Sequence, residues 1–129
     1  MKTSSLEEHI IKILQKEKIK FEREKTYSDL KSGYYRFDFF LPDFNICCEV
    51  DGMQHYKFLK VFYKKRQDFL KAQERDRRKN SYCLAHNILL YRIPYFEIEH
   101  IKQFKDIIQD KFLVKTKWHC DEVARNIPK

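Results

Sequence analysis

The sequence predicts a single α/β (α+β) domain in which helices flank a mixed sheet, in the order α-β-β-β-α-β-α. Segments with apolar residues at helical spacing alternate with short aromatic or β-branched runs, which are typical of strands. The chain has 129 residues, and its hydrophobic fraction of 43% is sufficient for one core. We therefore expect one domain over residues 1–114, followed by a loosely ordered tail over residues 115–129.

The N-terminal elements are a helix and a strand. Leu6, Ile10 and Leu14 follow helical spacing and a serine can cap the start, which predicts a helix over residues 5–17. Residues 19–27 alternate apolar and charged side chains, a pattern that indicates a strand with one buried face.

The next two predicted strands form a hairpin. Residues 34–41 are rich in aromatic side chains, and residues 46–51 are mostly apolar. Residues 42–45 have turn chemistry, with a proline, an aspartate and an asparagine. Because so short a turn joins the two strands, they should pair antiparallel.

The second half of the chain alternates helix, strand and helix. Residues 63–86 have a helical pattern, and residues 88–93 form an apolar run closed by Pro94, which predicts a buried strand. Apolar residues then recur at helical spacing from Ile98 to Phe112, which predicts a last amphipathic helix.

The net charge favours nucleic acid as the partner. Lys and Arg number 27 against 19 Asp and Glu, which gives a formal net charge of +8. Small, strongly basic domains typically bind nucleic acid. No apolar stretch is long enough to span a bilayer, the first residues lack the apolar core of a signal peptide, and the four cysteines include no C-x-x-C pair. We expect no membrane partner and a protein of the cytoplasm (the host cytoplasm for a viral protein) or the nucleus, and not a secreted one.

Carboxylates interrupt two of the predicted strands, although a charge inside an apolar strand is costly without a partner, a metal or a function. Asp38 lies in the aromatic strand, and Glu49 and Asp51 lie in the next one. Because side chains alternate along a strand, Glu49 and Asp51 share a face, and the hairpin would bring Asp38 beside them. Three converging carboxylates favour a divalent cation, and Mg²⁺ bound in this way is used to cut phosphodiesters. The alternative is ion pairing, of Asp38 with Arg36 or Arg92 and of Glu49 with a lysine.

A histidine follows the second strand of the hairpin. His55 comes shortly after Gly52, which lets the chain turn tightly. The turn would place the imidazole close to the carboxylates, where it would act as a general base on water.

Four stretches together resemble the PD-(D/E)xK nuclease superfamily, in the branch that is similar to very-short-patch-repair endonucleases and to the EDxHD homing endonucleases of phages. They read R-F-D at 36–38, E-V-D-G-M-Q-H-Y at 49–56, Q-E-R-D-R-R-K-N at 73–80 and L-Y-R-I-P at 90–94. The resemblance covers about residues 4–96. It implies a restriction-endonuclease-like fold and Mg²⁺-dependent cleavage of DNA, with Mn²⁺ as a possible substitute.

The resemblance also implies roles for individual residues. Asp38 corresponds to the principal metal-binding aspartate and Glu49 to the second carboxylate of the motif. His55 matches the histidine that is proposed to activate water. Asp76 matches an aspartate that orients this histidine or a metal-bound water.

A glutamate of the first helix also points into the site in the family. Glu7 and Glu8 are both candidates here. On a helical wheel Glu7 falls beside the apolar stripe and Glu8 points nearly opposite, so we choose Glu7. The alternative role for Glu7 is a capping box with Ser4.

The sequence departs from the superfamily pattern at the lysine two residues after the second carboxylate, where this chain has Asp51. The residue before Asp38 is Phe37, where the family has proline. The charge that the lysine supplies would then come from a second metal or from one of Gln54, His55 and Lys57. The number of metals and the identity of the base are left open by this departure.

The segment from 57 to 79 is rich in Lys and Arg with interleaved aromatic residues, which is typical of surfaces that follow a phosphate backbone. The candidate DNA-binding residues are Lys57, Lys60, Lys64, Lys65, Arg66, Arg75, Arg77 and Arg78. No sequence-reading module is recognisable, so contacts should be mainly to the DNA backbone. The alternative is a solvated helix whose aromatic residues lie in the core.

We therefore expect a metal-dependent DNA endonuclease of the homing or repair type, which nicks or cuts both strands. One such site cuts one strand at a time, so double-strand cleavage would require a dimer or two visits. The candidate partners besides DNA are a second copy of the chain, as a homodimer, and a separate DNA-targeting partner. The alternatives are a non-catalytic nucleic-acid-binding module on a decayed nuclease fold and, for an active enzyme, a Holliday-junction-type resolvase.

Overall fold

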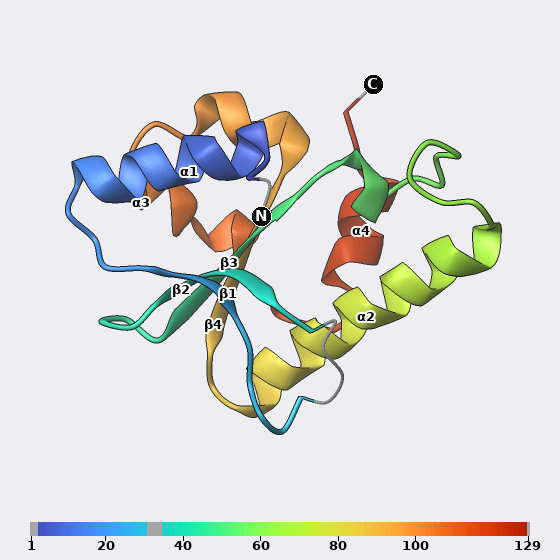
Figure 1. Ribbon diagram of the computed structural model, residues 1–129, viewed down its shortest axis with the longest axis horizontal. Coiled ribbons are helices and arrows are strands. Elements are labelled where there is room, and N and C mark those ends of the chain that lie inside the picture. The colour runs from blue at the N-terminus through green and yellow to red at the C-terminus, as the bar shows by residue number, and fades with distance from the viewer. Residues whose placement is uncertain (1–2, 31–34, 129) are drawn as a thin grey trace.

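The computed structural model describes residues 3–30 and 35–128, which form a mixed α/β fold with a four-stranded sheet at its centre (Figure 1). Figure 1 shows α1 on one side of the sheet and α2 with α4 on the other. The predicted class, a mixed sheet with flanking helices, is confirmed. None of the described helices is both long and apolar enough to cross a membrane.

The sheet has the strand order β1-β2-β3-β4. The strands are β1 (Glu22–Lys25), β2 (Phe37–Leu41), β3 (Ile46–Asp51) and β4 (Leu89–Pro94). The first three strands pair antiparallel, and β4 pairs parallel with β3, because the chain between them crosses over as a helix. The predicted hairpin of β2 and β3 is therefore confirmed.

The two faces of the sheet bury different side chains. On the face that carries α1 (Ser5–Lys16), Cys48 and Val50 of β3 belong to an apolar cluster with residues of that helix. On the other face, Cys47 packs with Cys83 of α2 (Arg66–Ala85). Glu49 and Asp51 alternate with Cys48 and Val50, so these two carboxylates are directed to the face that α2 covers.

Helix α2 turns an unusually polar face to the sheet. Its buried residues are Phe69, Asp76, Lys79, Asn80 and Cys83, which recur at helical spacing. Burying charged and amide groups is costly unless they are paired. Polar groups on the sheet must therefore meet this face of α2.

The prediction of one last helix over residues 98–112 is wrong. Residues 98–112 form three short pieces, a 3-10 helix over Tyr95–His100, α3 over Phe104–Ile107 and a 3-10 helix over Asp110–Phe112. A capping box starts α3 anew, since the Asp106 carboxylate accepts the backbone N–H of Gln103. The helical spacing of the apolar residues arises because each piece buries its apolar side chains in the cluster beside α1.

The C-terminal segment is ordered, unlike the loose tail expected over residues 115–129. It contains α4 (His119–Arg125), on which Cys120 is buried. Arg77 of α2 donates to both carboxylate oxygens of Asp121, at 3.1 and 2.8 Å. Asn80 donates to the carbonyl of Lys117 at 3.1 Å. These contacts fix the segment against α2.

Candidate active site

Two carboxylates occupy the point where β2 and β3 separate. The paired register of the two strands ends at Phe39 and Cys48. Beyond it, the Asp38 N–H donates to Oε1 of Glu49 at 2.8 Å, and the Val50 N–H donates to Oδ2 of Asp38 at 2.8 Å. Each carboxylate thus replaces a backbone acceptor of the facing strand, which fixes Asp38 and Glu49 side by side.

We call Asp38 and Glu49 together the carboxylate fork. They are two acids held close to each other. Burial and the negative charge of Glu49 raise the pKa of Asp38 well above its usual range, and Glu7 adds to the effect. The charge of Lys79 and the hydrogen bond from Val50 act against this rise without cancelling it. Crowded carboxylates of this kind bind a proton or a cation.

Lys79 is the cation nearest to the fork, and sequence reasoning did not select it. Its Nζ lies 2.9 Å from Oε2 of Glu49, and the side chain is only 9% exposed. The pairing of Glu49 with a lysine was the alternative to metal binding, and the structure shows that pair. The polar residues of α2 at helical spacing from Asp76 to Cys83 are the signal in the sequence that would have identified an inward-facing Lys79.

His55 and Asp76 form a second charged pair. His55 lies in the 3-10 helix η1 (Met53–His55), and its Nδ1 lies 2.9 Å from Oδ2 of Asp76 and 3.6 Å from Oδ1 of Asp51. Burial disfavours the charged imidazole, but Asp51 and Asp76 outweigh burial and raise the pKa of His55 to about 9. The imidazole is therefore protonated at neutral pH.

Asp51 belongs to a different cluster from the one predicted. Nη1 of Arg92 donates to both of its carboxylate oxygens, at 2.9 and 3.0 Å, and the Tyr56 hydroxyl donates to Oδ2 at 3.3 Å. Arg92 is fully buried, and its Nε donates to Asn80 at 2.7 Å. Both oxygens of Asp51, a predicted metal ligand, thus accept hydrogen bonds from Arg92 in this structure.

Of the three predicted metal-binding carboxylates, Asp38 and Glu49 lie together and Asp51 pairs with Arg92. Within residues 3–30 and 35–128, no three His, Cys, Asp or Glu side chains are arranged to hold a metal ion. Over the same residues, every buried side-chain nitrogen and oxygen has a hydrogen-bond partner. Arg92 also lies 3.5 Å from Asp76, so it links the Asp51 cluster to the histidine pair.

Glu7 of α1 is linked to the fork by Arg23, which contacts both Glu7 and the backbone of Asp38. Arg23 of β1 pairs with Glu7 and donates from Nε to the backbone carbonyl of Asp38 at 3.4 Å. The Glu7 N–H also donates to the Ser4 hydroxyl at 3.1 Å, so Ser4 caps the start of α1. Glu8 is exposed.

Gln54, a predicted catalytic residue, lies in the 3-10 helix η1 next to His55. Its side chain lies against Gly52, where a Cβ would come within 2.4 Å of Oε1. The backbone of Gly52 is extended, with φ −69 and ψ 173, so the tight turn that was expected to require this glycine is absent at this residue. The Gln54 carbonyl accepts a hydrogen bond from the Tyr63 hydroxyl at 3.0 Å.

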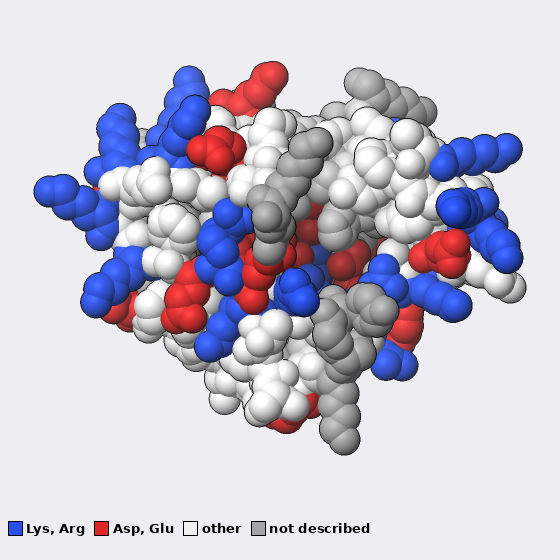
Figure 2. Space-filling view, viewed as in Figure 1, with Lys and Arg blue, Asp and Glu red and all other residues white. Residues whose placement is uncertain are grey.

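One pocket is lined by both members of the His55–Asp76 pair and by Lys79 of the Lys79–Glu49 pair. Its volume is about 220 Å³, and it is lined by His55, Asp76 and Lys79 together with Tyr63, Ala72 and Arg75. Since Lys79 also contacts Glu49, the carboxylate fork and the histidine pair adjoin at this lysine. Figure 2 shows acidic and basic side chains close together in the hollow at the middle of the face.

The predicted DNA-binding residues divide into two groups. The first group is exposed, in the loop before α2 and at its first residue, and consists of Lys57, Lys60, Lys64, Lys65 and Arg66. In Figure 2, Lys and Arg side chains project where Figure 1 shows this loop and the start of α2. In the second group, Arg75 lines the pocket, Arg77 holds Asp121, and Arg78 donates to Glu74 and to the Tyr35 hydroxyl, both at 3.3 Å.

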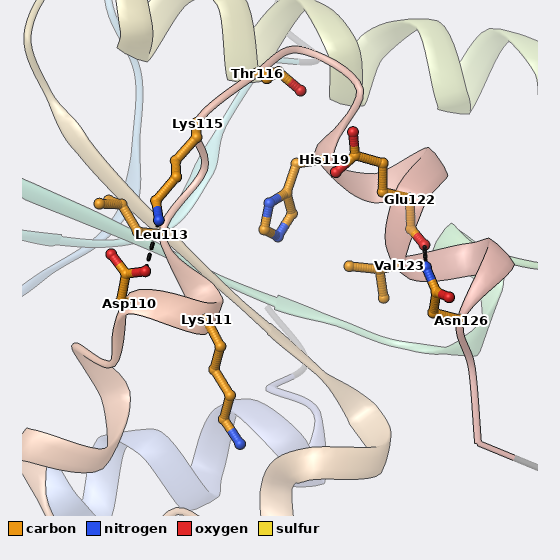
Figure 3. Close-up of a pocket in the computed structure, with 9 residues that line it drawn as sticks. All are labelled: Asp110, Lys111, Leu113, Lys115, Thr116, His119, Glu122, Val123 and Asn126. Atoms are coloured by element: carbon orange, nitrogen blue, oxygen red, sulfur yellow. Dashed lines mark hydrogen bonds and ion pairs between the residues drawn. The ribbon is translucent and has the colours of Figure 1, made fainter.

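A larger pocket of about 330 Å³ lies beside α4 and contains none of the predicted site residues (Figure 3). His119 points into it, and Lys115 closes one side by pairing with Asp110 at 2.6 Å. Burial lowers the pKa of His119, with Arg92 adding to the effect. The pocket at His55 is the better candidate, because its Lys79 contacts Glu49 of the crowded carboxylate pair.

The comparisons with known proteins identify no family. No protein-family model matches the chain, and no solved structure matches it. The chain is similar to "Uncharacterized protein 307L" of Invertebrate iridescent virus 6, with 36% identity over 67 residues. This match covers 50% of the present chain and 34% of the viral protein, so the chain spans about a third of that relative.

Proposed function

We propose that this chain is a metal-dependent endonuclease that hydrolyses phosphodiester bonds in DNA, on a restriction-endonuclease-like fold of the PD-(D/E)xK superfamily. One observation carries the proposal. The crowded pair of Asp38 and Glu49 contacts Lys79 through Glu49, and Lys79 lines a pocket together with His55, beside a loop of exposed lysines. Carboxylates for a cation and positive groups for a phosphate are the parts that this reaction needs.

Asp38 and Glu49 would hold Mg²⁺, for which Mn²⁺ could substitute. Two buried carboxylates fit this ion, because Mg²⁺ is usually bound by one or two carboxylates while water and substrate phosphates complete its shell. When bound, the ion would activate water and polarise the phosphodiester. Burial and the nearby charge of Glu49 raise the pKa of Asp38, and a cation bound at both carboxylates would stabilise their charged forms.

His55 would act on the phosphate in its charged form. With a pKa of about 9, the imidazole has no free electron pair to accept a proton at neutral pH, so the general-base role expected from the sequence would operate only in more alkaline solution. Asp76 orients the ring through Nδ1 and leaves Nε2 as the donor for a phosphate oxygen or a leaving group.

The pH dependence of the reaction should distinguish the two roles of His55. If the charged ring is needed, the single-turnover rate should stay level through neutral pH and fall as pH rises through about 9. A general base would give the opposite profile, with a rate that rises up to this pKa and then levels. His55→Ala should lose roughly 10²–10⁴-fold in rate, and its profile should lack this step.

The exposed loop should supply the affinity for DNA. Changing Lys64, Lys65 and Arg66 together to Gln should weaken binding to every DNA sequence, and should reduce the slope of log affinity against log salt by up to about 0.9 for each phosphate that the variant no longer neutralises. Fluorescence anisotropy over a salt series measures both quantities. A control that neutralises three other exposed lysines, Lys12, Lys16 and Lys105, should change the slope much less. Equal effects in the two variants would show that only net charge matters.

A non-catalytic DNA-binding module is the second candidate. The observation in its favour is that two of the site's acids already have cationic partners in the chain, Glu49 with Lys79 and Asp51 with Arg92. A decayed site of this kind would bind DNA without needing a metal.

Supercoiled plasmid incubated with the purified protein separates the two candidates. The endonuclease should convert it to nicked circles with Mg²⁺ or Mn²⁺ and stop on addition of EDTA, whereas the binding module should only retard it in a gel. Linear product that forms without a nicked intermediate would indicate a homodimer, since one site cuts one strand at a time and two separate visits give nicked circles first. Selective cleavage of four-way junctions would favour the resolvase role.

A further inference from the structure

Lys79 is a buried lysine that belongs to two parts of the site at once. Its ammonium lies 2.9 Å from Glu49, and the same side chain lines the pocket that contains His55 and Asp76. An ammonium has three donors on a flexible stem, and Glu49 accepts the only side-chain hydrogen bond from Lys79 found over the described ranges 3–30 and 35–128.

The carboxylate fork places two acids beside one ammonium, and only Glu49 pairs with it in the described part of the chain. Asp38 has no ion pair in the part of the chain that the structure describes, and its carboxylate accepts a hydrogen bond from the Val50 N–H. Two acids therefore share one ammonium. A divalent cation binding both acids would match their charge and would repel the ammonium at close range.

We propose that Lys79 is an internal counter-ion of Glu49 that a divalent cation displaces, and that the released ammonium then contacts a phosphate oxygen of DNA in the adjoining pocket. This inference rests on the proposed function for its substrate. The geometry that carries it is the position of Lys79 between Glu49 and the pocket, where a change of side-chain torsions transfers the ammonium from one partner to the other.

The counter-ion role predicts two effects of opposite sign when the charge of Lys79 is removed. The divalent cation should bind more tightly, because nothing competes with it for Glu49. The reaction should become slower, because the phosphate has one donor fewer. An ion pair that only stabilises the fold would shift both quantities the same way or neither.

The test compares Lys79→Met and Lys79→Arg with wild type and with Lys105→Met, which removes an exposed lysine. Titration of Mn²⁺ followed by electron paramagnetic resonance gives the metal affinity without DNA. Single-turnover nicking at saturating Mg²⁺ gives the rate. Lys79→Met should bind Mn²⁺ about tenfold more tightly or better. It should nick roughly 10²–10³-fold more slowly. Lys79→Arg should lie close to wild type in metal affinity, since it keeps the charge.

Unchanged or weaker Mn²⁺ binding by Lys79→Met would overturn the counter-ion role, and an unchanged rate would overturn the phosphate contact. If Lys79→Met unfolds, Lys79→Gln keeps a donor for Glu49 without the charge and gives the same two readouts. A wild-type protein that never nicks DNA, combined with tighter Mn²⁺ binding by the variant, would reject the endonuclease and keep the counter-ion. Nicking by wild type, combined with identical Mn²⁺ affinities, would reject the counter-ion alone.

Discussion

Asp38→Asn should abolish metal-dependent cleavage while leaving folding and DNA binding close to wild type. The amide keeps an oxygen to accept the Val50 N–H, so the fork between β2 and β3 should survive. It loses the negative charge that holds a cation, whose stabilisation of the transition state is worth several kcal/mol, and this corresponds to a rate loss of about 10³-fold or more. Single-turnover nicking and DNA anisotropy on the same preparation measure the two properties.

Asp43→Asn is the matched control for this prediction, because it removes an exposed carboxylate from the turn of the same hairpin. Its cleavage rate should equal that of wild type. Glu49→Gln should lose less activity than Asp38→Asn, since an amide oxygen still ligates weakly. Nicking by Asp38→Asn at a near-wild-type rate would remove Asp38 from the site.

Arg92→Met should produce the largest loss of stability. The fully buried guanidinium donates to Asp51 and Asn80 and lies 3.5 Å from Asp76. Burial alone would raise the pKa of Asp76, but the charges of Arg92 and His55 hold it well below its usual range. Methionine fills much of the volume but leaves two buried carboxylates without this partner. Breaking a buried pair in this way costs about 3–5 kcal/mol in the free energy of unfolding.

Urea titration measures this loss. Lys115→Met is the control, because it breaks an exposed ion pair with Asp110 that should contribute far less. A change for Arg92→Met no larger than that of the control would show that the Arg92 network does not hold α2 and β4 together. The two predictions are separable, since Asp38→Asn should unfold at nearly the same urea concentration as wild type.

Local sequence patterns predicted the sheet and the first helix. The strand over Ile46–Asp51 and the turn before it depend on residues that are neighbours in the chain, so composition and turn chemistry were sufficient. Alternation along that strand also placed Glu49 and Asp51 on one face. It could not assign their partners, because Lys79 and Arg92 reach these acids from elements that follow them in the chain.

The errors occurred where structure depends on distant contacts. The segment after residue 115 was expected to be loose because it has no strong apolar periodicity, yet α4 is held by Arg77 through Asp121. Arg77, one of the predicted DNA-binding residues, is thus paired with Asp121 in this structure. The prediction of a single final helix was wrong. The helical spacing of its apolar residues reflects their burial in the cluster beside α1, and the capping groups of Gln103 and Asp106 interrupt the helix.

The position of the bound cation tests the central claim most directly. Crystals grown with a short DNA duplex and Mn²⁺, and measured at the manganese absorption edge, give its location from anomalous scattering. We predict a manganese peak ligated by Asp38 and Glu49. A phosphate of the DNA should lie in the pocket beside His55, and Lys79 should be displaced from Glu49. A fork without an anomalous peak, with Lys79 still paired to Glu49 and DNA bound elsewhere, would contradict this prediction.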